Sequence, residues 1–224
     1  MSAHQHSSHP HHFLPGMGHP ALTPFYDSFA RLVARESTFK RRLIERLGLR
    51  AGQRVLDVGC GTGTLAIMVA EACRDVEIIG VDPDEEMLRR ARKKAEAAGT
   101  RIEFKNGSAT ELPFSDGSFD RVTSTLMAHH LPTAAKEQMF AEVCRVLKPA
   151  GELHLVDIGP ARSAVARSLQ RVLRPHVLDD NLSGKLPSMM SAAGLVDVAE
   201  EDRVVVVFGP LIFWRARRAL ASSL

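Results

Sequence analysis

The chain has 224 residues, of which 45% are hydrophobic, and its formal net charge is +3 with histidine neutral. A chain of this size can bury one sizeable core, so we expect a single domain over residues 21–224. The weak net charge does not indicate a nucleic-acid partner, and no apolar run is long enough for stable membrane insertion. The first residues lack the apolar core of a signal peptide, and Cys60, Cys73 and Cys144 follow no metal-binding pattern. The sequence therefore predicts a cytoplasmic protein with reduced thiols and no metal site.

The first 20 residues differ in composition from the rest of the chain. They hold six of the ten histidines, interspersed with serine, proline and glycine. Such a segment cannot pack a core, so we predict that residues 1–20 are disordered in part. A histidine-rich tract can also bind a divalent metal, an alternative that the sequence leaves open. Apolar residues return at Phe13, and residues 13–35 are expected to fold over the functional site.

Hydrophobic periodicity predicts alternating helices and buried strands. The predicted helices span residues 22–34, 39–47, 65–73, 84–98, 134–147, 162–173 and 186–193. The predicted strands span residues 54–58, 77–81, 101–105, 119–125, 152–158, 196–208 and 211–217, and a tight turn at Gly209-Pro210 joins the last two. This alternation indicates an α/β protein with a doubly wound, mostly parallel sheet. The closing pair is expected to add an antiparallel strand at the edge, giving seven strands with the last one reversed.

The most informative segment is Val55-Leu56-Asp57-Val58-Gly59-Cys60-Gly61-Thr62-Gly63-Thr64, which runs from a strand through alternating glycines into a helix. Glycines let backbone amides approach a ligand, and a helix N-terminus favours negative charge. The spacing argues against a dinucleotide, because Thr64 stands where G-x-G-x-x-G needs its third glycine. Asp57 would repel a phosphate, whereas it would favour the ammonium and sulfonium groups of S-adenosylmethionine.

These residues resemble motif I, D-x-G-x-G-x-G, of the class I S-adenosylmethionine-dependent methyltransferases. The likeness extends over residues 40–217, and the chain broadly resembles the ubiquinone/menaquinone-biosynthesis-like (type 11) branch that acts on small molecules. The resemblance implies a Rossmann-like methyltransferase fold and S-adenosylmethionine as the cofactor. The motif residues that it implies in cofactor binding are Asp57, Gly59, Cys60, Gly61 and Gly63.

The adenosine part of the cofactor is expected to bind at two further segments. Asp82 ends the second predicted strand, where a carboxylate can accept hydrogen bonds from both ribose hydroxyls. NAD sites use the same arrangement, so Asp82 alone indicates only adenosine. Pro83 and Met87 are expected to pack against adenine. The segment around Ser108 resembles the family's G-D-A-x-x-L-P-F, but serine replaces its acid, so we expect Ser108 and the Ala109 amide to bind adenine through weaker, neutral hydrogen bonds.

A segment after the fourth predicted strand ends in His129-His130. Family proteins often have a similar apolar segment that ends in His-His-Leu. The resemblance implies that its early backbone, here Thr125 and Leu126, contributes to the methionine end of the cofactor site, and that the later residues face the substrate. His129 and His130 are therefore candidate general bases. In the alternative interpretation, one histidine braces the loop and the other packs inside.

Two groups of basic residues are candidates for binding an acidic partner. The basic run at 89–94 follows Glu85 and Glu86 on one predicted helix, which favours acid–base pairs such as Glu85–Arg89 and Glu86–Arg90 on a solvated face. Arg215, Arg217 and Arg218 are expected to be exposed charges of an edge strand. Neither group requires a nucleic acid.

The resemblance predicts methyl transfer by in-line displacement, for which the protein aligns the reactants and excludes water. Residues 13–35 and 159–187 mix apolar side chains with arginines, which favours a small, apolar, aromatic or lipid-like acceptor. A nucleic-acid or protein methyltransferase and a non-catalytic protein that binds the cofactor are the competing interpretations. The sequence leaves open whether the chain forms a homodimer.

Overall fold

A seven-stranded sheet with the order β3-β2-β1-β4-β5-β7-β6 organises the fold. The computed structural model describes residues 36–162, 179–206 and 209–220. The strands are β1 (Arg54–Val58), β2 (Glu77–Asp82), β3 (Glu103–Asn106), β4 (Phe119–Thr125), β5 (Leu147–Ile158), β6 (Leu195–Val206) and β7 (Gly209–Arg218). The strands β1 to β5 pair in parallel, and β7 runs antiparallel to both of its neighbours. The predicted doubly wound, mostly parallel sheet with a reversed last strand is confirmed.

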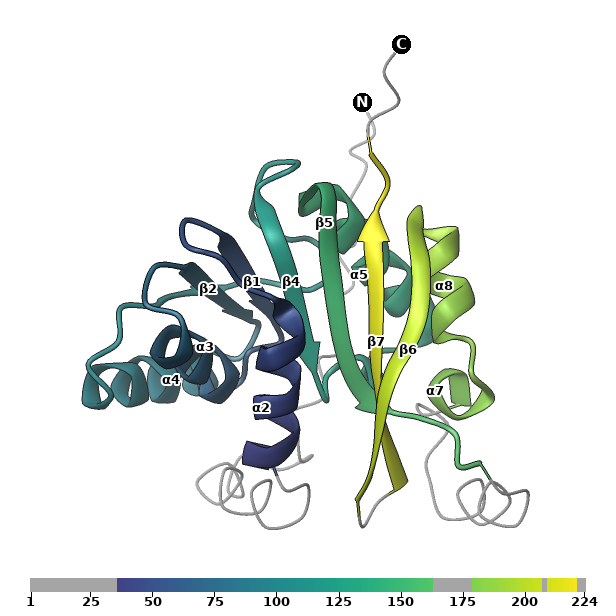
Figure 1. Ribbon diagram of the computed structural model, residues 1–224, viewed down its shortest axis with the longest axis horizontal. Coiled ribbons are helices and arrows are strands. Elements are labelled where there is room, and N and C mark those ends of the chain that lie inside the picture. Colours follow the sequence, from purple (N-terminus) through teal and green to yellow (C-terminus); the bar gives the residue numbers. More distant parts are fainter. Residues whose placement is uncertain (1–35, 163–178, 207–208, 221–224) are drawn as a thin grey trace, which may run out of the picture.

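Helices cover both faces of this sheet (Figure 1). The described helices are α2 (Glu36–Leu47), α3 (Thr64–Ala72), α4 (Glu85–Ala97), α5 (Thr133–Val146), α7 (Asp179–Ser183) and α8 (Leu186–Ala192), with a 3₁₀ turn η2 (Ala128–His130). On one face, α2, α3 and α4 pack over a core that includes Phe39 and Leu88. On the other face, α5 and α8 pack over a core that includes Phe140 and Met190. No helix in the described ranges is long and apolar enough to cross a bilayer.

Most predicted elements are present with boundaries within a few residues, and β4 has the predicted boundaries. The predicted helix at 22–34 and all but the first residue of the one at 162–173 lie outside the described residues. The histidine-rich segment and most of residues 13–35 and 159–187, expected to face the acceptor, also lie outside them. The helix α7 falls between the predicted helices at 162–173 and 186–193, where the sequence predicts neither helix nor strand. The predicted turn at Gly209-Pro210 is wrong, because Gly209 and Pro210 pair with Val206 and Val205 and so belong to β7.

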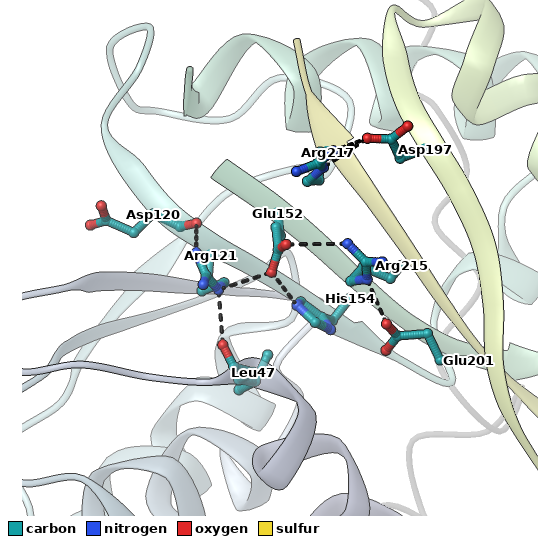
Figure 2. A network of polar contacts seen from close by, with 9 residues as sticks. All are labelled: Leu47, Asp120, Arg121, Glu152, His154, Asp197, Glu201, Arg215 and Arg217. Carbon is teal, nitrogen blue, oxygen red and sulfur yellow. Dashed lines mark hydrogen bonds and ion pairs between the residues drawn. The ribbon is translucent and has the colours of Figure 1, made fainter. Parts of the chain in front are cut away.

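The reversed strand is not at the edge of the sheet, which corrects the sequence-based expectation. Because β7 pairs with β5 on one side and with β6 on the other, β6 is the edge strand. The arginines of β7 have partners within the sheet, and Figure 2 shows those of Arg215 and Arg217. Arg215 contacts Glu152 and Glu201, Arg217 contacts Asp197, and Arg218 donates to two backbone carbonyls.

A partly buried charge network ties β4, β5 and β7 together towards the amino ends of the parallel strands (Figure 2). Glu152 lies at its centre, 3.4 Å from Arg121 and 3.3 Å from both His154 and Arg215. These partners, His154 first among them, lower the pKa of Glu152 from 4.5 to about 2. Arg121 also donates to the carbonyl of Leu47 at 2.9 Å, which fixes the end of α2 on the sheet. His154 is buried.

The basic run on α4 forms ion pairs along the helix. Glu86 contacts both Arg89 and Arg90, so the predicted Glu86–Arg90 pair is present at 2.9 Å. Glu85 contacts Arg92 rather than Arg89, which pairs with Glu86. Arginines of the run therefore pair with acidic side chains of the same helix.

Candidate active site

The glycine turn between β1 and α3 is fixed to the neighbouring strand. The amides of Gly59 and Cys60 both donate to the carbonyl of Val81 on β2, at 2.8 and 3.0 Å. The Gly63 amide then donates to the carbonyl of Cys60 at 2.9 Å. The turn is thereby held at the carboxyl end of the parallel strands, where open α/β sheets bind their ligands.

The three glycines of the turn all have positive φ, but they serve different purposes. A Cβ on Gly59 would lie 2.3 Å from Cγ of Met127, and one on Gly63 would lie 2.8 Å from the ring of Phe104. A Cβ on Gly61 would meet no atom within 4 Å. Gly59 and Gly63 therefore permit close packing, whereas Gly61 borders open space that a ligand can approach. The Cys60 side chain is in the core with Phe104, so only its backbone can face a ligand.

Asp82 lies beside this open position. One carboxylate oxygen accepts from the Gly61 amide at 2.9 Å, and the other accepts from the Asp84 amide at 3.0 Å. The residue is 8% exposed, and burial raises the pKa of its carboxyl. Each oxygen keeps a further acceptor site. A carboxylate fixed in this way fits the predicted contact with a pair of ribose hydroxyls.

Asp57 is buried in β1 at the start of the motif, with 1% of its surface exposed. Its Oδ1 accepts from the hydroxyl of Thr123 on β4 at 2.9 Å. Burial raises the pKa of Asp57 from 3.8 to about 6, although the charge of Lys40 and the Thr123 hydrogen bond oppose the rise. A buried carboxylate with such a raised pKa lacks a full counter-charge, which is the environment that a ligand ammonium would complete.

The segment around Ser108, which is predicted to bind adenine, lies next to Asp82. The Gly107 amide donates to the Asp82 carbonyl at 3.2 Å, so the following Ser108 and the buried Ala109 lie near the end of β2. The Ser108 oxygen already contacts the Thr110 hydroxyl at 2.7 Å and accepts from its amide at 3.2 Å. Met87 is buried in the first turn of α4, and the preceding Pro83 is exposed. The contact of these residues with adenine stays a prediction.

The end of β4 is locally strained. Leu126 has φ of 53°, a left-handed conformation that side chains rarely adopt. Its amide donates to the carbonyl of Val156 on β5 at 2.9 Å, which holds the distortion in place. Thr125 precedes it at the carboxyl end of the strand, and η2 follows. Strain of this kind concentrates at functional sites.

The 3₁₀ turn η2 places His129 against Asp157 at the end of β5. The ring Nδ1 of His129 lies 2.7 Å from Oδ1 of Asp157, and the backbone amide of His129 donates to Oδ2 at 3.2 Å. Asp157 is fully buried. A buried carboxylate facing Nδ1 favours the tautomer that carries its proton on Nδ1, and this tautomer leaves the Nε2 lone pair free to accept a proton.

His130 has a different environment from His129, although the two rings are 4.0 Å apart. Withdrawal from water, reinforced by the neighbouring His129, lowers the pKa of His130 from 6.5 to about 4. Its imidazole is therefore neutral at neutral pH, and no carboxylate orients it among the described residues. The geometry favours His129 over His130 as the base.

A family model described as a methyltransferase domain matches residues 55–151, which include the glycine turn, Asp82 and both histidines. A demethylmenaquinone methyltransferase from Thermus thermophilus is 35% identical over 70% of this chain and 71% of its own length. The chain belongs to the class I S-adenosylmethionine-dependent methyltransferases, of the menaquinone-biosynthesis-like type. It is an enzyme of that family, and its cofactor is S-adenosylmethionine.

Two further similar proteins show the range of the family. The 27-O-demethylrifamycin SV methyltransferase of Amycolatopsis mediterranei is 36% identical to the present chain, over 65% of the present chain and 54% of the relative's own length. An S-adenosylmethionine-dependent methyltransferase from Aquifex aeolicus has a TM-score of 0.67 at 20% identity, covering 88% of this chain and 98% of the other. The structural likeness shows the fold.

The sequence interpretation did not identify Asp157, which contacts His129, or Lys40, whose charge acts on Asp57, or Glu36, the ion-pair partner of Lys40. Asp157 is 28 positions from His129, and Glu36 and Lys40 are on a helix before the motif. A carboxylate at the end of a buried strand was the only available signal for Asp157. No local pattern identified Glu36 or Lys40.

Proposed function

We propose that this methyltransferase methylates a small, apolar or aromatic acceptor and that His129 is its general base. The observation that carries the proposal is the hydrogen bond between Nδ1 of His129 and Asp157. When bound, S-adenosylmethionine supplies an electrophilic methyl group. His129 takes the acceptor's proton at Nε2 as the acceptor atom attacks, and Asp157 stabilises the resulting imidazolium.

The small-molecule acceptor is supported by two kinds of observation. Relatives are named for demethylmenaquinone and for 27-O-demethylrifamycin SV. The net charge is only +3, and arginines of α4 and β7 are engaged in ion pairs, which argues against a nucleic-acid substrate. We also infer that the reaction takes place in the cytoplasm, because the cysteines Cys60, Cys73 and Cys144 are free.

A methyl-transfer assay tests the proposal. The full chain is incubated with S-adenosylmethionine carrying a deuterated methyl group and with a panel of naphthols, hydroquinones, hydroxylated macrolides, RNA and a protein mixture. We expect the label on an aromatic or apolar small molecule. Label on RNA or protein alone would support the competing class of methyltransferase, and cofactor binding without any transfer would support a non-catalytic role. Sedimentation of the same sample tests whether the chain forms a homodimer.

A further inference from the structure

A buried ion pair on α2 has no part in the functions described so far. Glu36 and Lys40 lie one helical turn apart and contact each other through their charged ends. They are only 8% and 7% exposed. Glutamate and lysine are rarely buried to this degree, and a buried ion pair often contributes little to stability because both charges lose their hydration. Stability alone is therefore a weak reason for this pair.

The pair lies next to the methyltransferase motif. Phe39 and Leu43, from the same helix, pack in one core with Leu65 from the first turn of α3. The positive charge of Lys40 acts on the carboxylate of Asp57, two residues before Gly59. The structure thus brings α2 to the strand end and glycine turn that bind the cofactor in this family.

The charges of this group are not balanced. Glu36 and Asp57 contribute two carboxylates, and Lys40 contributes one ammonium. The amino-acid end of S-adenosylmethionine is a zwitterion, with one ammonium and one carboxylate. It complements the Glu36–Lys40 pair charge for charge, and its ammonium would also compensate Asp57. Because the protein charges are already buried and held, little further ordering is needed for binding.

We propose that the Glu36–Lys40 pair opens to bind the amino-acid end of S-adenosylmethionine. Lys40 binds the cofactor carboxylate, and Glu36, together with Asp57, binds the cofactor ammonium. One internal ion pair is exchanged for two pairs with the ligand. The proposal rests on the cofactor of the family and is independent of the acceptor and of His129.

Three ligands that differ only in the amino-acid end test these roles. S-adenosylhomocysteine carries the ammonium and the carboxylate, its decarboxylated analogue carries only the ammonium, and 5′-methylthioadenosine carries neither. Binding to the full chain is measured by calorimetry, which requires no turnover. The variants are Lys40→Met and the double variant Glu36→Gln/Lys40→Met. The double variant leaves no unpaired charge from the pair, so it keeps the test valid if Lys40→Met alone does not fold.

The matched control is Glu103→Gln/Lys105→Met. It removes a pair of the same residue types on β3, 3.3 Å apart and with side chains 55% and 39% exposed. We expect the control to leave the affinities for all three ligands unchanged.

Lys40→Met should weaken S-adenosylhomocysteine about tenfold or more, the effect of one lost charge-assisted hydrogen bond. It should leave the other two ligands unaffected. The double variant should weaken both ligands that carry the ammonium and spare 5′-methylthioadenosine. Unchanged affinity for S-adenosylhomocysteine, or an equal loss for all three ligands, would overturn the proposal. Failure of the unmodified chain to bind S-adenosylhomocysteine would overturn it too, whereas binding without methyl transfer would contradict only the proposed function.

Discussion

Asp157 accepts two hydrogen bonds from His129, one from the ring Nδ1 at 2.7 Å and one from the backbone amide at 3.2 Å. The amide of Ile158 also donates to Oδ1 of Asp157, at 2.7 Å. The carboxylate is therefore held by its own strand and in turn holds the histidine. This arrangement orients His129 through β5 rather than through its own short turn.

Asp157→Asn should lower kcat about a hundredfold and change KM little, because the amide can no longer fix the ring or stabilise its charged form. Steady-state kinetics on the acceptor found in the labelling assay measure this. The ring ¹⁵N signals of His129 should move from the Nδ1-protonated tautomer towards a mixture of tautomers. Asp116→Asn, at a site 73% exposed beside Arg145, is the matched control. A purely structural role for Asp157 would lower stability and leave kcat of the folded protein unchanged.

Asp57→Asn should stabilise the chain while weakening cofactor binding. The folded state raises the pKa of Asp57 from 3.8 to about 6. Between these values the folded state binds more protons than the unfolded state, so stability is lost as the pH rises through this window. Above pH 6 the cost reaches about 3 kcal/mol.

Urea unfolding at pH 7.5 and pH 4 measures this effect. The unfolding free energy of the Asp57→Asn variant should exceed that of the unmodified chain at pH 7.5, and the gap should shrink at pH 4. Affinity for S-adenosylhomocysteine should fall in the variant at both pH values. A variant that is less stable at pH 7.5 would contradict the environment assigned to Asp57.

Comparison of Gly61→Ala with Gly52→Ala should distinguish the effect of backbone strain on stability from the effect of an added methyl group on ligand binding. Gly61 and Gly52 have φ of 53° and 80°, and an added Cβ at either would meet no atom within 4 Å. Each substitution should therefore cost about 1 kcal/mol of stability. Only Gly61→Ala should weaken S-adenosylhomocysteine in calorimetry, because its methyl group enters the open space beside Asp82. Equal affinities in the two variants would remove Gly61 from the cofactor site.

Glu152→Gln should lower the unfolding free energy by about 1 to 3 kcal/mol at pH 7, because it leaves Arg121, His154 and Arg215 without their shared carboxylate. The pKa of Glu152 is lowered from 4.5 to about 2. Its contribution is therefore complete above pH 4.5 and is lost as the pH falls towards 2. Urea unfolding against pH should show the two proteins converging in that window. We expect kcat/KM to be unchanged, and a large loss of activity without loss of stability would contradict a structural role.

The features that the sequence predicts correctly are carried by contiguous residues. The glycine turn, Asp82 at a strand end and the β4 boundaries depend on neighbours along the chain. The remaining features depend on residues far apart in sequence. The His129–Asp157 contact and the place of Lys40 beside Asp57 require the assembled sheet. The position of β7 between β5 and β6 follows from strand pairing, which periodicity does not specify. For this reason the sequence does not indicate that Arg215 contacts Glu152 and Glu201.

Transfer of a deuterated methyl group to a small aromatic or apolar acceptor, compared between the unmodified chain and His129→Gln, tests the proposed function most directly. Mass spectrometry of the product and the rate of its formation are both recorded. We predict a labelled small molecule and a rate at least a hundredfold lower in the variant, with unchanged affinity for S-adenosylhomocysteine. Transfer at the same rate in His129→Gln, or label found only on RNA or protein, would contradict it.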